Sequence, residues 1–513
     1  MERRLFSDFR HESEPHPPDP WGFIMAERTL LSLDKVDPEQ AWQPWKPDEQ
    51  QPWNLKWAGH LFRRAGFGAS LEELNTAVTD GLKTTVDRIL LGEKGTEEFY
   101  NQFLFPSDPK KTETGLYVAR ENNGYKLRSW WLYALYHSPH PLREKMTLFW
   151  HNHFVSSIAK VQSGVKMYNQ NKLLRKYALG KFPPFLLDIS MDAAMLDYLD
   201  SNSNINSKPN ENYAREVMEL FSLGVGNYTE KDIREAARAF TGWHTDGNRF
   251  TFKGDLHDEG SKTVLGQTGD WDGGDVVRIC LEQKVCARFL VRKLYRFYVS
   301  EAVQPSDAFL APLADAYRKS DYDTGALVRT ILLSRHFYSE FAYRQRIKSP
   351  VEYVLGLTRA VGYSPRGKLL VDPEALVGHL ELLSQHLFAP PNVKGWEGGT
   401  AWLNTATLVL RHNFAYSFCL RGGELNLNAR SRTGSAATAV DPSALARYPT
   451  PIKKPDALVA FYADLLLQGD ITKEARARLT GFLTEGDPED YERDRRIKEM
   501  IHALLTTPEY QLA

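Results

Sequence analysis

The sequence predicts a mainly α-helical protein, with one large multi-helical domain and a small inserted β-hairpin. Helix start signals recur along residues 51–420, and apolar residues spaced three and four apart follow each of them. One interval, residues 243–269, is instead rich in Gly, Asp and Thr and alternates as short strands joined by turns do. These observations together favour the mainly α class.

Four segments are expected along the 513 residues. Residues 1–50 are rich in Pro, Asp, Glu and Gln without a sustained period, which predicts an extended N-terminal arm. Residues 51–420 are expected to form the helical core domain, with the hairpin near 243–269. Residues 421–450, rich in Gly, Ser and Ala, predict a flexible linker or loop, and residues 451–513 predict C-terminal helices that pack on the core.

Capping signals locate the individual helices. Ser70 and Glu73 have the spacing of a capping box, and one apolar stripe then runs from Leu71 to Ile89. This stripe predicts a single helix that ends at Gly92. Further helix starts are expected at Ser138-Pro139, Pro209, Thr229, Thr324, Ser349-Pro350 and Asp372-Pro373.

Charge and motifs exclude several function classes. The net charge of −1 gives the chain no overall electrostatic attraction for nucleic acid, which argues against nucleic acid as a partner. Arg288, Arg292 and Arg296 recur every four residues and could meet phosphates, but such a stripe more often bridges to nearby carboxylates. No GxGxxG, GxxxxGK[ST], GxSxG or HExxH motif occurs as an interpretable unit, which excludes the ordinary nucleotide, α/β-hydrolase and zincin sites.

Cysteine content and the N-terminal sequence bear on location. The three cysteines, Cys280, Cys286 and Cys419, have no CxxC spacing, so a reducing compartment without a disulfide framework is expected. The N-terminal sequence contains arginines but no apolar run of seven residues, so it predicts neither a signal peptide nor a membrane span. On these grounds the sequence as given predicts a cytoplasmic protein.

The stretch "LFWHNHFVSS", residues 148–157, places His151 and His153 on either side of an asparagine in an aromatic run. On an unbroken helix the two imidazoles point to opposite sides and cannot bind one ion. They could share an ion only if the helix ended near Trp150 and the chain continued extended. The alternative is that they are core histidines, each satisfied by a neighbouring group.

A second polar segment is "PNENYAREVMELFSLGVGNYT", residues 209–229. On a helix, Asn212, Glu216 and Glu219 fall on one stripe, where two like charges repel unless a cation lies between them. Arg215 is one turn from Glu219 and could neutralise it instead, which would make this face a solvated, ion-paired surface.

The expected hairpin contains "HDEGSK", in which His257, Asp258 and Lys262 lie close together. Such a loop can supply metal ligands, act as acid and base, or be a hydrophilic turn. The helix before the hairpin carries Arg238 and leads to Trp243 at the start of the strands.

A further loop, "PPNVKGWEGGTAWLN" at residues 390–404, places Lys394 and Trp396 beside glycines. Glycine lets the backbone approach a ligand closely, and the indole offers a flat surface for stacking. The alternative is a tight structural turn held by a buried tryptophan.

These segments resemble a bacterial family known as "domain of unknown function 1800". The resemblance runs in order over almost the whole chain after the first fifty residues and implies a predominantly helical fold, but no established reaction. Members of the family are often exported and encoded near alkaline-phosphatase-like partners, which implies a periplasmic location, although this chain shows no export signal. The shared stretches are "HLFRRAGFG" (60–68), "FWHNHF" (149–154), "PNENYAREVMELFSLGVGNYTEKDIREAARAFTGW" (209–243), "HDEGSKTVLG" (257–266), "ARFLVRKLYRFYV" (287–299), "PPNVKGWEGGTAWL" (390–403) and "TTPEYQL".

The first functional hypothesis is a metal-dependent enzyme, either a hydrolase or an oxidoreductase, that binds one divalent metal ion. Glu219 or Asp258 would be the general base beside the catalytic Glu216, and Arg215 and Lys262 would stabilise anionic charge. The expected metal ligands are His151, His153, Glu216 and His257, and the expected substrate-binding residues are Asn212, Arg238, Trp243, Lys394 and Trp396.

The second hypothesis is a binding or assembly protein in which the same residues form a buried polar network and a protein partner binds the tryptophan-rich surface. A third hypothesis is a metal-free acid–base enzyme that uses Glu216 and Asp258 and binds its ligand near Trp396. The substrate is unknown under each hypothesis.

Overall fold

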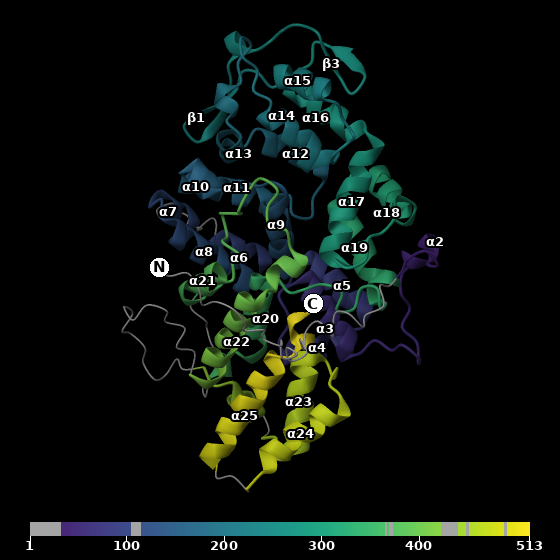
Figure 1. The fold of residues 1–513 in the computed structure, drawn as a ribbon, viewed down its shortest axis with the longest axis vertical. Coiled ribbons are helices and arrows are strands. Elements are labelled where there is room, and N and C mark those ends of the chain that lie inside the picture. Colours follow the sequence, from purple (N-terminus) through teal and green to yellow (C-terminus); the bar gives the residue numbers. More distant parts are fainter. Residues whose placement is uncertain are drawn as a thin grey trace, which may run out of the picture.

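Helices dominate the computed structural model, in which three two-stranded antiparallel sheets are the only sheets of the described part (Figure 1). The predicted mainly α class is thereby confirmed. No helix of this part is both long and apolar enough to cross a membrane. The structure describes residues 32–103, 114–364, 367–368, 373–421, 440–447, 451–486 and 490–513.

The N-terminal third builds the middle of the molecule in Figure 1, where helix α9 is central. Its helices are α2 (Pro38–Ala41), α3 (Leu55–Ala65), α4 (Leu71–Asp80), α5 (Leu82–Leu91), α6 (Thr96–Phe103), α7 (Thr114–Arg120), α8 (Gly124–His137), α9 (Pro141–His153), α10 (Ile158–Val161) and α11 (Gly164–Lys176).

The next segment forms the upper end of the molecule in Figure 1 and carries the two larger hairpins. It contains α12 (Phe182–Ser190), α13 (Ala193–Tyr198), η1 (Ser201–Ser203), α14 (Asn212–Glu216), the π-helix η2 (Val217–Ser222), α15 (Glu230–Ala239), β1 (Trp243–Asp246), β2 (Arg249–Phe252), η3 (Gly254–Leu256), β3 (Lys262–Val264), β4 (Gln267–Gly269) and α16 (Gly273–Glu282).

The remaining elements run back through the middle and form the lower end in Figure 1. They are α17 (Lys284–Tyr298), α18 (Asp307–Lys319), α19 (Thr324–Leu333), η4 (His336–Tyr338), α20 (Pro350–Val361), β5 (Tyr363–Ser364), β6 (Gly367–Lys368), α21 (Pro373–Leu382), η5 (Gly399–Trp402), α22 (Thr405–Leu420), η7 (Pro442–Arg447), α23 (Pro455–Leu467), α24 (Lys473–Thr484), α25 (Asp490–Leu505) and α26 (Pro508–Gln511).

The predicted capping box of Ser70 and Glu73 is present at the start of α4. The prediction of one helix up to Gly92 is wrong, because the helix stops at Gly81 and α5 begins at Leu82. Gly81 has φ 81°, a left-handed conformation that ends a helix and that apolar periodicity does not reveal. The expected single hairpin near 243–269 is a pair of hairpins, β1–β2 and β3–β4.

The expected N-terminal arm lies partly outside the described residues, but its last part, residues 32–50, is docked on the body rather than extended. The indole of Trp42 donates to the carbonyl of Phe309 (2.9 Å), and the amide of Trp45 donates to the carbonyl of Leu333 (2.7 Å). Both side chains are buried, so apolar burial of tryptophan outweighs the polar composition of this segment.

One hydrophobic core connects the expected core domain with the C-terminal helices, since a continuous cluster of buried residues extends from Ala41 to Tyr510. Helix α25 packs against α22. Ile347 and Leu512 form a β-bridge that ties the last residues to the segment before α20. Most of the expected 421–450 linker lies outside the described residues, and its described part includes the buried 3₁₀ turn η7.

Candidate functional site

A pocket of about 450 Å³ opens between α9, α17 and the loop of residues 392–402. Lys394 and Trp396, two of the expected substrate-binding residues, belong to its wall, and Asn152 and Lys293 face them from the two helices. A pocket of this size accommodates a small organic molecule.

Asn152 holds the loop that carries Trp396. Its Oδ1 accepts a hydrogen bond from the amide of Trp396 (2.6 Å), and its Nδ2 donates to the carbonyl of the same residue (3.2 Å). Gly395 has φ +81°, and a Cβ at this position would lie 2.2 Å from Asn152 Oδ1. The glycine therefore allows the loop to approach α9 closely enough for this clamp.

His151 and His153 face different segments because α9 continues unbroken through His153. The amide of Phe388 donates to Nε2 of His151 (3.2 Å), whereas Nε2 of His153 donates to the carbonyl of Phe221 (3.1 Å). The condition under which both could bind one ion, a helix ending near Trp150, is not met. Within the described structure each histidine is a buried side chain with a backbone partner.

Burial sets the protonation of these histidines. It lowers the pKa of His151 to about 3 and, helped by the nearby positive charge of Lys293, lowers the pKa of His153 well below its ordinary value. Both imidazoles are therefore neutral near pH 7. Because His153 donates through Nε2, its Nδ1 carries the lone pair, and this buried atom has no hydrogen-bond partner in the structure.

The carbonyl that His153 binds belongs to the π-helix η2, which follows α14 directly. Within η2 the amide of Leu223 donates to the carbonyl of Met218 (2.8 Å), five residues back. A π-turn interrupts α-helical spacing and occurs frequently at functional sites. Glu216 and Glu219 lie on either side of this change of register, which the α-helical pattern of the sequence did not predict.

Glu216 is half-buried, and burial followed by the charge of Glu219 raises its pKa to about 7. The positive charge of Lys394 opposes this shift, so Glu216 lies within electrostatic range of the pocket wall. Glu219 accepts a hydrogen bond from Tyr228. Arg215 pairs with Glu211 (3.0 Å) and Glu230 (2.8 Å) rather than with either of these carboxylates.

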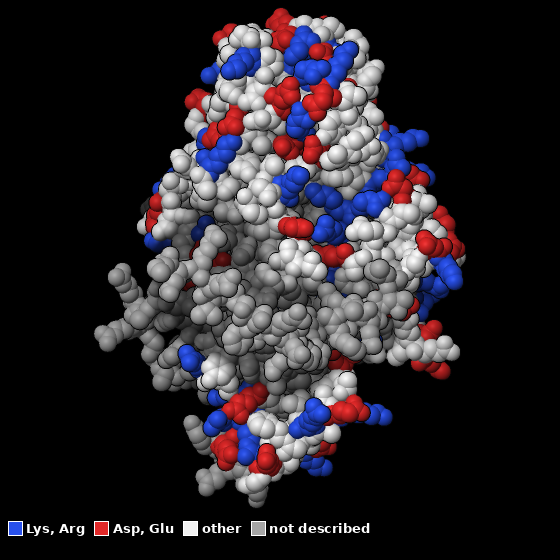
Figure 2. Space-filling model, in the orientation of Figure 1, with Lys and Arg blue, Asp and Glu red and all other residues white. Residues whose placement is uncertain are grey.

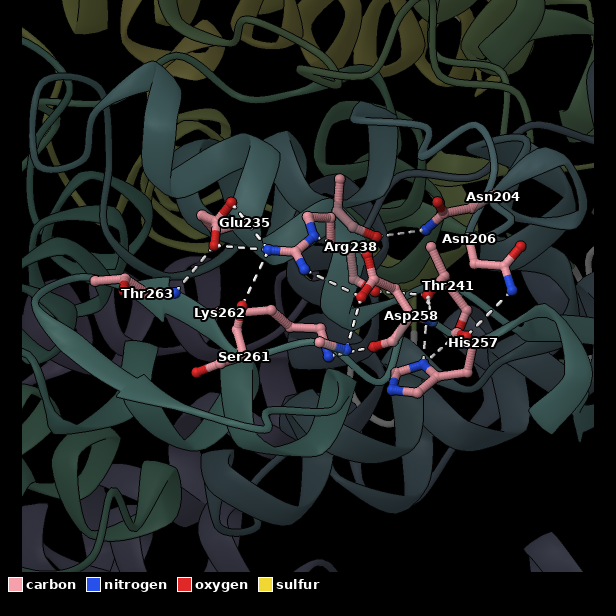
Figure 3. A network of polar contacts seen from close by, with 12 residues as sticks. Asn204, Asn206, Glu235, Arg238, Thr241, His257, Asp258, Ser261, Lys262 and Thr263 are labelled. Atoms are coloured by element: carbon pink, nitrogen blue, oxygen red, sulfur yellow. Dashed lines mark hydrogen bonds and ion pairs between the residues drawn. The ribbon is translucent and has the colours of Figure 1, made fainter.

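The predicted residues of the hairpin region form a separate polar network (Figure 3). Arg238 binds both carboxylate oxygens of Asp258 at 2.7 and 3.0 Å and also pairs with Glu235 (3.0 Å). Arg238 lowers the pKa of Asp258, and the carboxylate stays ionised and paired. This arrangement fastens the 253–262 loop to α15.

Further hydrogen bonds of this network also hold the 253–262 loop in place. His257 Nδ1 donates to the carbonyl of Thr241 (2.9 Å), and the amide of Asp258 donates to Thr241 Oγ1 (2.8 Å). The buried Lys262 donates to the carbonyl of Asp258. Trp243 is buried at the base of β1.

The four expected metal ligands therefore lie in different surroundings: His151 behind Trp396, His153 against η2, Glu216 near the pocket wall and His257 in the hairpin network. Within the described residues, no group of three or more His, Cys, Asp or Glu side chains could hold a metal ion. Asn212, also expected at the site, is exposed and donates to Asp200 (3.4 Å).

Lys293 is a candidate residue that the sequence reasoning missed. It is partly buried in the pocket wall, and its ammonium lies 5.3 Å from the ring centroid of Phe289. Burial, followed by the charge of Arg296, lowers its pKa to about 7. Among the described residues it has no hydrogen bond or ion pair. The sequence did offer one signal for a partly buried lysine here, because Lys293 lies one helical turn from both Phe289 and Phe297.

Lys and Arg side chains gather on the surface over α17 (Figure 2). Arg288 and Arg292 of the predicted stripe pair with Asp307 at 3.2 and 2.6 Å. Arg296 donates to the carbonyl of Glu397 (2.8 Å) and so fastens the pocket loop. These arginines are engaged with the protein itself, which leaves Lys293 and Lys394 as the cations that face the pocket without such partners in the described structure.

The chain matches the family described as "Protein of unknown function (DUF1800)" over residues 60–512. No curated protein and no solved structure matches it significantly.

Proposed function

The chain belongs to the DUF1800 family, and from the geometry of its pocket we propose that it is an enzyme that uses Lys293 as a base or nucleophile on a small substrate. The observation that carries the proposal is one unpaired lysine with a pKa of about 7 in the wall of a pocket of about 450 Å³. Strongly shifted pKa values concentrate at functional sites.

The chemistry follows from the neutral amine. A lysine that is substantially unprotonated near pH 7 can accept a proton or attack an electrophilic carbon, which an ordinary lysine does poorly because it stays charged. Trp396 and Trp402 supply flat apolar surface in the same pocket, and Lys394 supplies a positive charge for an anionic group of the substrate.

The supporting structure keeps the pocket in shape. Asn152 fixes the backbone of Trp396, and Glu301 accepts hydrogen bonds from the amides of Gly399 (3.1 Å) and Ile347 (3.3 Å). The middle of the loop, at Trp396 and Gly399, is thereby attached to other elements before a ligand arrives. Such preorganisation reduces the ordering cost of binding.

The test measures the reactivity of individual lysines with acetic anhydride as a function of pH, by mass spectrometry of the intact protein and its peptides. Lys293 should acetylate with a midpoint near pH 7, as its pKa requires, whereas a lysine of ordinary pKa becomes reactive only at much higher pH. Lys293→Met should remove the early phase, and Lys208→Met should leave it unchanged. A profile for Lys293 that coincides with that of Lys208 contradicts the proposal.

The metal-dependent hydrolase or oxidoreductase is the second candidate, and the raised pKa of Glu216 beside Glu219 is the observation that favours it. A divalent cation would relieve the repulsion between these carboxylates. Metal analysis of the purified protein tests this candidate: stoichiometric metal that Glu216→Ala and His153→Ala both remove supports it. Metal-free protein with an ordinary Lys293 would leave the binding or assembly protein as the best explanation.

A further inference from the structure

A second, smaller cavity lies behind the pocket, at the junction of α3, α20, α23 and the C-terminal residues. Its volume is about 30 Å³, and Arg63, Lys348 and Tyr510 contribute to its lining. Glu352 lines both this cavity and the pocket of the proposed site. The C-terminus lies at this junction, beside α3 and α20 (Figure 1).

Lys348 is the principal feature of the cavity. Lys348 is only 5% exposed, and its ammonium lies 3.5 Å from the ring centroid of Tyr510. In the described structure this ammonium has neither an ion pair nor a hydrogen bond. Burial lowers the pKa of Lys348 well below its ordinary value, and the charges of Arg63, Arg344 and Arg411 lower it further.

Arg63, which also lines this cavity, has further hydrogen-bond donors without acceptors. One of its terminal nitrogens donates to Gln468 Oε1, but its Nε and Nη2 are buried without a hydrogen-bond acceptor. A buried donor that remains unpaired costs about 1–3 kcal/mol, and a charged one costs more. Lys348 and Arg63 together therefore bring several unpaired donors to the lining of one small cavity.

The carboxylate side chains near the cavity already have other partners. Glu352 is the acidic residue of the lining, and it is already bound by Lys145 and by Arg346 (3.2 Å). Asp470 pairs with Arg344 (2.9 Å). Neither Lys348 nor Arg63 has an ion pair with a carboxylate side chain of the described structure, which favours an anion as the occupant of the cavity.

We propose that this cavity is a binding site for a small monovalent inorganic anion of the size of chloride, held by Lys348 and Arg63. The volume of about 30 Å³ corresponds to roughly two water molecules, which suits chloride or bromide and excludes organic ligands. The site is separate from the proposed catalytic pocket. Ala513, which also lines this cavity, is the competing partner of these cations.

The experiment compares thermal unfolding of the full chain in sodium gluconate and in sodium chloride at equal ionic strength. Chloride should raise the unfolding midpoint of the natural protein in a saturable way, by several degrees. Lys348→Met should lose this shift and, in gluconate, should be at least as stable as the natural protein, because it removes an unpaired buried ammonium. Lys208→Met, an exposed control, should keep the full shift.

A second measurement does not depend on a folded variant. Crystals of the natural protein soaked in sodium bromide should show an anomalous peak between Lys348 and Arg63. Equal midpoints in chloride and gluconate together with no bromide peak would overturn the proposal. A chloride shift that persists in Lys348→Met would also overturn it.

Discussion

Three consecutive side chains of α9 each hold a different segment. His151 accepts from the amide of Phe388, Asn152 clamps Trp396, and His153 binds the carbonyl of Phe221. Neighbouring residues on a helix point in different directions, so one short stretch can contact several segments that are far from it in sequence. The motif therefore shapes the pocket, whether or not it also binds a ligand directly.

At the same scale, Glu216→Gln should change the pH dependence of stability. The pKa of Glu216 is about 7 in the folded protein, above its value of about 4.3 in an unfolded chain. The ionised carboxylate is thus disfavoured in the fold, and its contribution to stability declines as pH rises from about 4.3 to about 7. Above about pH 7 the variant should be more stable by about 1 kcal/mol, after allowance for solvent screening.

Urea unfolding at about pH 8 and about pH 4 measures this difference, which should disappear at the lower pH. Glu49→Gln, at an exposed position, should have no effect at either pH. A variant less stable than the natural protein at the higher pH would show that Glu216 is ionised and stabilised by a cation.

At the scale of elements, single side chains from neighbouring helices hold the π-helix η2 and the 253–262 loop in place. His153 supplies a hydrogen bond to a carbonyl of η2, and Arg238 holds the loop through Asp258. The sequence left metal binding, acid–base chemistry and a hydrophilic turn open for His257, Asp258 and Lys262 of the "HDEGSK" loop. In this structure they take part in a fastening between α15 and the hairpins.

A double-mutant cycle on Arg238 and Asp258 tests this fastening. Arg238→Met and Asp258→Asn should each lower the free energy of unfolding by about 1–2 kcal/mol, and the double variant should lose less than their sum by more than about 0.5 kcal/mol. The partial exposure of both side chains limits the effect. Additive losses, measured by urea unfolding, would mean that the pair does not couple the loop to α15.

For the whole molecule, a buried ion pair joins the N-terminal helices to the C-terminal half of the sequence. Lys145 of α9 bonds to Glu352 of α20 and to the carbonyl of Gly66 (2.8 Å), and Arg346 also pairs with Glu352. Burial lowers the pKa of Lys145 to about 8, opposed by the charge of Glu352. This network connects the N-terminal helices to the C-terminal half at the floor of the pocket.

Glu352→Gln should therefore destabilise the entire fold by about 3–5 kcal/mol, because two buried cations lose their carboxylate. Unfolding should remain a single transition by circular dichroism and by tryptophan fluorescence, since one continuous core joins both halves. Glu49→Gln again serves as the exposed control. Separate transitions for the two probes would show that the halves unfold independently.

Much of the local structure followed from the sequence. The Ser70 and Ser349 capping boxes and the Thr229 cap begin helices where expected. The break at Gly81 and the docking of Trp42 could not be predicted. The sequence does not reveal that a glycine adopts a positive φ or that a tryptophan is buried, because both depend on tertiary contacts. Lys394 and Trp396 were correctly placed in one loop, but the pocket around them depends on α9 and α17.

The sequence by itself determined the mainly α class, the positions of many helix starts and the polar segments, which lie within the residues that match the DUF1800 family. Only the tertiary structure decided that Asp258 is paired with Arg238, that α9 directs His151 and His153 to different segments, and that Lys293 lines a pocket. The physical reason is that helix signals act over one or two turns, whereas the charge state of a side chain depends on burial and on partners distant in sequence.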